Sequence, residues 1–256
     1  GEIIWSYKFD DTPYISETLD SLIFIGAGKV CYGFDLVKQD VVWAFETKNL
    51  ITVPPKIYHK TVYVGCWDGN LYALDFKTGR LKWKYQTGWS IDSIPEIKDG
   101  LVYFGSLDNC FYALDEKTGE LKWCFKCKAA IHSSPTVYGE YVFFGCDDGR
   151  VYALNKTNGR LVWNFIPKYS IKEDANNYIT TPILSTPVIH NGIIYISIEG
   201  YVYALDAQTI EVSEGKKIVK PSPFKYILVS LICMVTLAVL LLLHFIAKVK
   251  IGHKKD

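Results

Sequence analysis

The chain repeats one stretch of sequence at a nearly fixed interval. The stretch reads CWDGNLYALDFKTGRLKW up to Trp83, returns as SLDNCFYALDEKTGELKW up to Trp123, and returns again as CDDGRVYALNKTNGRLVW up to Trp163. Weaker copies end at Trp43 and begin at Tyr201. A period of about 40 residues is the signature of a repeat architecture, in which each copy is one structural unit packed on its neighbours. The repeat therefore predicts shape first and says less about activity.

Each copy alternates apolar runs with tight turns. In the third copy the runs IDSIPEI, LVYFGS, CFYALD and ELKWCFK are separated by the turn sequences DG, LDN and EKTG. β-branched and aromatic residues favour strands, and DG favours a hairpin turn. Helical periodicity is absent from all five copies. A four-stranded antiparallel sheet cannot bury both of its faces alone, but a radial stack of such sheets can, and this arrangement is a β-propeller.

The predicted fold class is therefore all-β, a β-propeller of four-stranded antiparallel blades. The five predicted blades cover residues 11–46, 50–87, 90–127, 130–166 and 179–212. The last copy reads ALDAQT and lacks the usual glycine and tryptophan, whereas the chain begins GEIIW. We expect residues 1–9 to supply the outer strand of the last blade and close the ring, which removes exposed edges. The alternative is that these residues are the tail of a preceding blade.

The motif A-x-D-x-x-T-G-x-x-x-W carries a family resemblance. It is complete from Ala73 to Trp83 and from Ala113 to Trp123, and the next copy departs from it at Asn155 and Asn158. The motif resembles the tryptophan-docking signature of quinoprotein-like propellers, also called pyrroloquinoline-quinone (PQQ) repeats, over residues 1–212. The resemblance implies that the Asp and Thr-Gly shape a hairpin and that the Trp packs between blades. The implied structural docking residues are Trp5, Trp43, Trp83, Trp123 and Trp163.

An uncharged apolar run follows the repeats. Residues 226–247 form a segment about 33 Å long if helical, enough to cross a bilayer core. We expect a PQQ-like propeller over 1–212, a Lys/Pro juxtamembrane linker over 213–225, a transmembrane helix over 226–247 and a short basic tail over 248–256. Lysines on the two sides of the helix are equal in number, so charge does not set the orientation. The family resemblance favours an extracytoplasmic propeller.

Composition excludes one class of partner and one class of site. The chain has 28 Lys and Arg against 27 Asp and Glu, scattered through the repeats. Nucleic-acid binding needs a concentrated basic surface, so no nucleic-acid partner is expected. Six of the seven cysteines lie in the repeats at irregular spacing. Cys124 and Cys127 form one CxxC pair without the second pair that a zinc site needs. We interpret these cysteines as small apolar strand residues.

Carboxylates in the turns between strands two and three fall on one propeller face, together with the connections between blades. The candidate partner-binding residues in these turns are Asp68, Asp108, Asp147, Asp148 and Glu199. The longest connection adds an insertion at about 168–181, and long loops on rigid scaffolds often carry function. The candidate residues in this insertion are Lys172, Glu173, Asp174, Asn176 and Asn177. The alternative interpretation makes the carboxylates ordinary turn formers and the insertion a solvated spacer.

The inner strands place four equivalent residues along the channel. These residues are Thr52, Asp92, His132 and Leu184. Asp92 and His132 come from adjacent blades and are expected to approach one another. Without a third ligand or a nucleophile they form a weak basis for chemistry. We therefore predict no catalytic, cofactor-binding or metal-binding residue.

Three functions remain open. The first is a membrane-tethered, non-catalytic scaffold that docks a protein partner, as the resemblance to assembly members of the family implies. The second is a PQQ-dependent dehydrogenase, although the chain has none of the adjacent cysteine pairs against which such enzymes often stack the quinone. The third is a ligand-sensing extracytoplasmic domain. Fold alone does not separate these functions.

Overall fold

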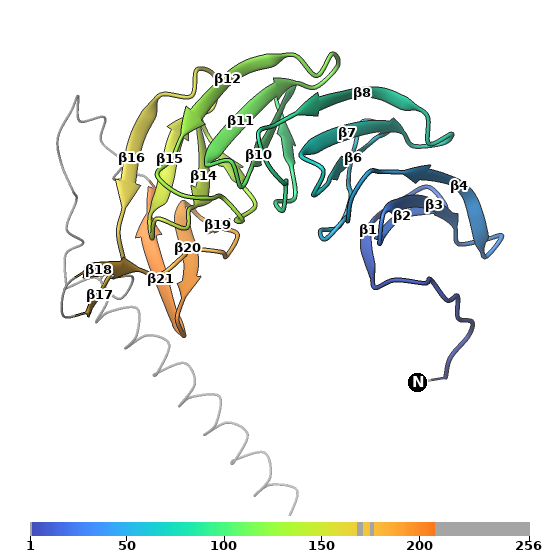
Figure 1. Cartoon of the computed structure of the whole chain (residues 1–256), viewed down its shortest axis with the longest axis horizontal. Helices are drawn as coiled ribbons and strands as arrows, with labels where there is room; N and C mark the ends of the chain where they lie inside the picture. The colour runs from blue at the N-terminus through green and yellow to red at the C-terminus, as the bar shows by residue number, and fades with distance from the viewer. Residues whose placement is uncertain (1, 168–170, 175–176, 208–256) are drawn as a thin grey trace, which may run out of the picture. The chain divides into compact units, whose positions relative to one another are not determined.

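Every element of the described structure is a β-strand. The computed structural model describes residues 2–167, 171–174 and 177–207. All of them belong to one compact unit, Gly1–Lys216. Figure 1 shows the sheets following one another in chain order, from β1–β4 in blue to β19–β21 in orange.

Four sheets contain four antiparallel strands each, in sequence order. Blade 1 contains β1 (Pro13–Leu19), β2 (Leu22–Ala27), β3 (Val30–Asp35) and β4 (Asp40–Glu46). Blade 2 contains β5 (Lys56–Tyr58), β6 (Thr61–Gly65), β7 (Asn70–Asp75) and β8 (Leu81–Gln86). Blade 3 contains β9 (Glu96–Lys98), β10 (Leu101–Gly105), β11 (Cys110–Asp115) and β12 (Leu121–Lys126). Blade 4 contains β13 (Thr136–Tyr138), β14 (Tyr141–Gly145), β15 (Val151–Asn155) and β16 (Leu161–Phe165).

Two further sheets lie beyond blade 4. One is a hairpin of β17 (Ile171–Asp174) and β18 (Asn177–Thr180), with Ile171 paired to Thr180. The other contains β19 (Val188–His190), β20 (Ile193–Ile198) and β21 (Tyr201–Asp206). The β17–β18 hairpin occupies the insertion that the sequence predicted as an irregular loop. This prediction was wrong for the backbone, because the two runs IKED and NYIT pair with each other.

The core lies between blades rather than within one of them. One cluster joins Tyr63 and Leu71 of blade 2 to Phe104 and Tyr112 of blade 3. The central strands are buried on both faces, whereas outer strands such as β8 alternate buried and exposed residues. Each sheet therefore buries its faces against its neighbours, as the sequence pattern predicted. The prediction of stacked four-stranded antiparallel blades is confirmed for the first four blades, and the strands match a β-propeller. The sheet in the place of the predicted fifth blade, 179–212, has three strands among the described residues, because β18 pairs with β17 instead.

The N-terminal segment differs from the ring-closure prediction. Residues 2–9 form no strand and contribute none to the β19–β21 sheet. Their aromatic rings pack on blade 1 instead. Trp5 stacks on Phe34 with ring centroids 5.6 Å apart, and Tyr7 meets the edge of the same ring at 5.0 Å. Phe34 lies on the face of its blade that a preceding blade covers in the other repeats. The rings of residues 2–9 cover that face in blade 1 and so bury Phe34.

The C-terminal predictions lie outside the described residues. They are the linker at 213–225, the membrane helix at 226–247 and the tail at 248–256. Among the residues that the structure describes, no helix has the length and apolar character to cross a membrane.

Candidate functional site

The repeated tryptophans join each blade to the next. The indole Nε1 of Trp43 donates to the Phe76 carbonyl at 2.9 Å, and Trp83 and Trp123 make the same bond one blade further on, at 3.0 and 3.1 Å. The three indoles are 8–9% exposed. Trp163 is half-buried and stacks on Phe165, while Trp5 stacks on blade 1 as described above. These contacts give the tryptophans a structural role.

The turn between strands three and four explains the rest of the motif. The Asp75 carboxylate accepts hydrogen bonds from the backbone N–H of Thr78 at 3.0 Å and from its hydroxyl at 2.9 Å. Gly119 has a φ of 74°, and a Cβ there would lie 2.6 Å from the Trp83 ring. Glycine is therefore required twice, by the left-handed backbone and by the docked indole. These hairpins, with the turns between strands one and two, define the hairpin face.

The opposite face, here called the loop face, contains the turns between strands two and three and the connections between blades. The two kinds of segment contact each other directly. Gly88 of one connection donates its N–H to Asp108 at 2.7 Å, and Lys48 donates to Asp68 at 3.1 Å.

Three of the predicted loop-face carboxylates have structural partners. Asp68, Asp108 and Asp148 each accept a hydrogen bond from the tyrosine four residues later, at 2.7, 2.7 and 2.5 Å. Each also caps the N–H two residues later, at 2.9–3.1 Å. Burial opposes ionisation of Asp68, but its hydrogen bonds from Tyr72, Asn70 and Lys48 outweigh it and lower the pKa of that carboxyl. These three acids hold the turns together.

Asp147 makes a different contact. Its carboxylate lies 3.0 Å from Nδ1 of His132, which belongs to the connection before blade 4. The hydrogen bond that Nδ1–H donates to the Asp147 carboxylate raises the pKa of His132 against the effect of burial, and the charge of Asp92 adds to the rise. The pair is half-buried on the loop face. Here a predicted turn acid meets a predicted channel residue.

The predicted channel residues lie in the connections between blades, just before strand one, rather than in the inner strands. The Thr52 hydroxyl donates to the Asp92 carboxylate, and the indole Nε1 of Trp67 lies 3.4 Å from the same oxygen. Asp92 and His132 therefore interact through charge, while each has its own hydrogen-bond partner. Leu184 is 58% exposed. In the described residues no group of three or more His, Cys, Asp and Glu side chains could hold a metal ion.

Exposed apolar side chains on the loop face are the feature that sequence reasoning missed. Trp67 is 40% exposed, Trp89 is 67% exposed, and Leu50 is 39% exposed. Their backbone segments are adjacent, because the Trp67 backbone N–H donates to the Leu50 carbonyl at 2.9 Å and the Trp67 carbonyl accepts from the hydroxyl of Ser90, the residue after Trp89, at 3.0 Å. The signal was present in the sequence, since these two tryptophans fall outside the period of the docking tryptophans. We call Leu50, Trp67 and Trp89 the aromatic patch.

The remaining sequence-predicted candidates are Glu199 and the residues of the insertion, for which the structure describes fewer contacts. Glu199 is exposed at the turn between β20 and β21, with a φ of 45°. Lys172, Glu173 and Asp174 belong to β17, and Asn177 begins β18, whereas Asn176 lies outside the described residues. The structure describes only the backbone of this hairpin.

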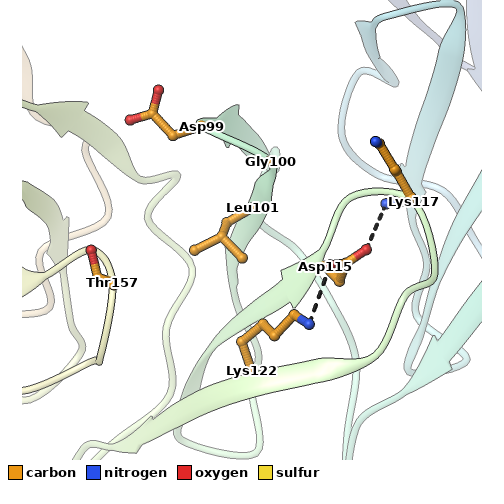
Figure 2. A pocket seen from close by; sticks show the side chains of 7 residues that line it. All are labelled: Asp99, Gly100, Leu101, Asp115, Lys117, Lys122 and Thr157. Carbon is orange, nitrogen blue, oxygen red and sulfur yellow. Dashed lines mark hydrogen bonds and ion pairs between the residues drawn. The ribbon is translucent and has the colours of Figure 1, made fainter.

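An open pocket of about 480 Å³ lies on the hairpin face, between blades 3 and 4. Figure 2 shows the residues that line it, which are Asp99, Gly100, Leu101, Asp115, Lys117, Lys122 and Thr157. Asp115 accepts from the Lys117 N–H at 3.0 Å and pairs with Lys122 at 3.2 Å. Backbone hydrogen bonding from Thr118 is the main cause of the lowered pKa of Asp115. Because the Asp115 carboxylate already shapes the hairpin, this pocket is a weaker candidate binding site than the loop face.

Comparison with known proteins identifies the family. The family model described as outer membrane protein assembly factor BamB, which is built from PQQ repeats, matches residues 1–90 and 26–222. The chain belongs to this family. No curated protein sequence matches the chain significantly.

Solved structures share the fold of the family at low sequence identity. BamB from Moraxella catarrhalis is 19% identical with a TM-score of 0.67, over 82% of this chain and 66% of that one. The computationally designed Ika8 protein is 16% identical with a TM-score of 0.61, over 73% and 56%. Quinohemoprotein alcohol dehydrogenase from Comamonas testosteroni is 18% identical with a TM-score of 0.56, over 76% and 38%. The chain thus spans less than two thirds of each of these proteins, and the likeness establishes the β-propeller fold.

Proposed function

We propose that this chain is a non-catalytic scaffold that docks a protein partner on its loop face. The observation that carries the proposal is the aromatic patch. Exposed tryptophans on adjacent segments are uncommon on a surface that binds nothing, and tryptophan is enriched among the residues that dominate binding energy. The family model supports the same class of function, because it is named for an assembly factor.

The repeat does not require the aromatic patch. The position of Trp67 is Leu107 in blade 3 and Asp147 in blade 4, and the position of Trp89 is Asn49 one connection earlier and Ala129 one connection later. The turns form in every case, with the same cross-blade backbone bond from the turn N–H to the preceding connection at 2.9–3.0 Å. Two indoles at these places therefore add contact area to the surface without serving the fold.

Acidic groups beside the patch indicate the chemistry of the partner. Asp92 lies next to Trp67, and Asp147 lies in the equivalent turn two blades further along the same face. Indole rings with nearby carboxylates suit a segment that combines apolar side chains with lysine or arginine. We propose that the partner presents such a basic and apolar segment.

Membrane attachment is part of the proposal and rests on the sequence. The uncharged run at 226–247 is long enough to span a bilayer, and only the linker at 213–225 separates it from the repeats. A propeller held this way works close to the membrane surface, and the family resemblance favours a location outside the cytoplasm.

Site-specific photo-crosslinking tests the docking surface. A photoreactive amino acid placed at Trp89 or Leu50, in membranes of the source organism, should give a defined adduct with a partner protein. The matched control is Tyr138, which is 41% exposed on the hairpin face. Adducts of equal yield from all three positions, or from Tyr138 alone, would exclude the loop face as the docking surface.

A PQQ-dependent dehydrogenase is the second candidate, favoured by the fold shared with a quinohemoprotein enzyme. The four equivalent residues in the connections before strand one do not fit a calcium–quinone site. Calcium takes six to eight oxygen ligands, whereas the equivalent positions offer Thr52, Asp92, an imidazole and a leucine. Moreover, the His132 imidazole is already paired with Asp147. Titration of the chain with PQQ and Ca²⁺ tests this candidate, and saturable binding would revive it.

A further inference from the structure

Two buried thiols meet at the junction of blades 3 and 4. Cys127 follows β12 and is 6% exposed, and Cys146 follows β14 of the next blade and is fully buried. Both belong to one apolar cluster that spans the junction, and the Cys146 thiol contributes to the raised pKa of the Cys127 thiol. The described cysteines are all free thiols.

The equivalent pair at the preceding junction shows how closely these side chains face each other. There the positions hold Thr87 and Ser106, whose hydroxyl oxygens are 3.3 Å apart. The backbone anchors are the same at both junctions: the N–H groups of Thr87 and Cys127 each donate across the sheet at 2.8 Å. The side chains of Ser106 and Cys146 both reach the carbonyls of the preceding connection, at 3.2–3.5 Å.

The paired side chains at the third junction, between blades 3 and 4, differ in chemistry from those at the first two, between blades 1 and 2 and between blades 2 and 3. The first junction pairs Thr47 with Cys66, the second pairs two hydroxyls, and the third pairs two thiols. A threonine at the first position also donates to the carbonyl two residues later, at 2.7 and 2.6 Å at the first two junctions. Two thiols give up the stronger hydroxyl hydrogen bonds, but they can form a covalent bond.

We propose that Cys127 and Cys146 form an oxidisable pair that closes into a disulfide and locks blade 3 to blade 4. A disulfide has an S–S bond of about 2.05 Å and forms between side chains that already face each other. Rotation about the two Cα–Cβ bonds brings the sulfurs together from the contact that the repeat geometry provides. The bond spans two blades and closes a loop of about 20 residues.

The reaction is thiol–disulfide exchange with a small-molecule disulfide such as oxidised glutathione. The Cys127 thiol loses its proton and attacks the reagent, which releases one glutathione thiol and leaves a mixed disulfide. The Cys146 thiolate then attacks the Cys127 sulfur and releases the second glutathione thiol. Two protein thiols are oxidised to one disulfide, and one glutathione disulfide is reduced to two thiols.

The surroundings favour a lasting bond over a rapidly exchanging one. The hydrogen bond with Cys146, together with burial, raises the pKa of Cys127, so little thiolate exists in the folded protein. Exchange then requires opening of the junction, both to form and to reduce the bond. Once formed, it fixes the connection that carries His132 against the turn that carries Asp147, and so stiffens the loop face at that point.

Mass mapping after refolding in glutathione buffers tests the proposal. The full chain is refolded at a reducing and at an oxidising glutathione ratio, alkylated under denaturing conditions and digested. We expect a crosslinked peptide joining Cys127 to Cys146 only from the oxidising buffer, and a midpoint of thermal unfolding raised by roughly 5–10 °C. Alkylation of both residues after oxidising refolding, or pairing of either with the exposed Cys124, would overturn it.

The repeat supplies the matched control. Cys127→Thr combined with Cys146→Ser installs the pair that the preceding junction carries, so the double variant should fold. Its midpoint of thermal unfolding should be the same in both buffers. If the double variant shows the same oxidation-dependent rise as the unmodified chain, the stabilisation comes from other thiols and the proposal fails. The mass map of the unmodified chain decides independently of any variant.

Discussion

Trp83 and Trp89 lie six residues apart in the chain, but one is buried between blades and the other is exposed. Trp83 is 9% exposed, docks over Gly119 of the next blade and donates its indole N–H to Glu116. Trp89 is 67% exposed at the next connection. The first recurs with the repeat and the second does not. The comparison teaches that recurrence marks residues that hold blades together, and that departures from the repeat mark candidate binding residues.

The largest expected effect is on stability at the docking tryptophan. Trp83→Ala removes a buried indole and its hydrogen bond, so we expect a loss of about 3–5 kcal/mol in the free energy of unfolding. Trp89→Ala, at an exposed position, should change it by less than about 0.5 kcal/mol. Denaturant unfolding of the two variants measures both values. Equal losses would break the distinction between the two kinds of tryptophan.

Two glycines separate backbone strain from indole docking. Gly119→Ala introduces a Cβ into the Trp83 ring at a φ of 74°, whereas Gly100→Ala has a similar φ of 79° with no atom within 4 Å of its Cβ. We expect losses of about 2–3 kcal/mol for Gly119→Ala and about 1 kcal/mol for Gly100→Ala. Thermal and denaturant unfolding give the difference. If the two glycines respond alike, the indole contact contributes little.

The loop-face turns should respond in proportion to the bonds removed. Asp108→Ala deprives the Tyr112 hydroxyl and the N–H groups of Gly88 and Cys110 of their acceptor. We expect a loss of about 1–3 kcal/mol in unfolding free energy. Tyr112→Phe removes one of the three bonds and should cost about 1 kcal/mol or less. A larger cost for the tyrosine variant would contradict a turn-holding role for the acid.

The smallest effect depends on pH. The folded state raises the pKa of His132 above its unfolded value, so its ion pair with Asp147 stabilises the fold at low pH. That contribution is full below about pH 6.5 and is lost as the pH rises through the folded pKa. Relative to His132→Gln, the unmodified chain should be more stable at pH 5 than at pH 8, by less than about 1 kcal/mol.

The pair on the hairpin face serves as the control for this pH effect. Lys156 lies 2.8 Å from Asp99, and their mutual hydrogen bond raises the pKa of the lysine and lowers that of the acid. Both groups stay charged between pH 5 and pH 8. Substitution of Lys156 by Met should therefore shift stability equally at both pH values. A shift that varied with pH in the same way as for His132 would implicate some other titrating group.

The repeat made most of the fold predictable. Strand order, the hairpin turns and the inter-blade indoles follow from local spacing, because each blade solves the same packing problem in the same way. The role of residues 2–9 did not follow, since sequence alone cannot tell a strand that completes the last blade from a segment that packs on the first. The β17–β18 hairpin was missed because the runs IKED and NYIT are short and polar.

The candidate site was less predictable than the fold. Asp68, Asp108 and Asp148 were expected to face a partner, but their turns also need them, and only the structure shows the tyrosine hydroxyls that donate to them. The pairing of His132 with Asp147 depends on contact between a connection and a turn, which spacing does not reveal. Trp67 and Trp89 were visible in the sequence as tryptophans outside the repeat period. Their exposure in the structure makes them candidate binding residues.

The most direct test of the central claim measures binding and stability on the same double variant. Trp67→Ala combined with Trp89→Ala should lower the yield of the crosslinked partner adduct, formed from a probe at Leu50, by about tenfold or more. Its free energy of unfolding should stay within about 1 kcal/mol of the unmodified chain. An unchanged adduct yield from a folded double variant would contradict the claim that the aromatic patch is the docking surface.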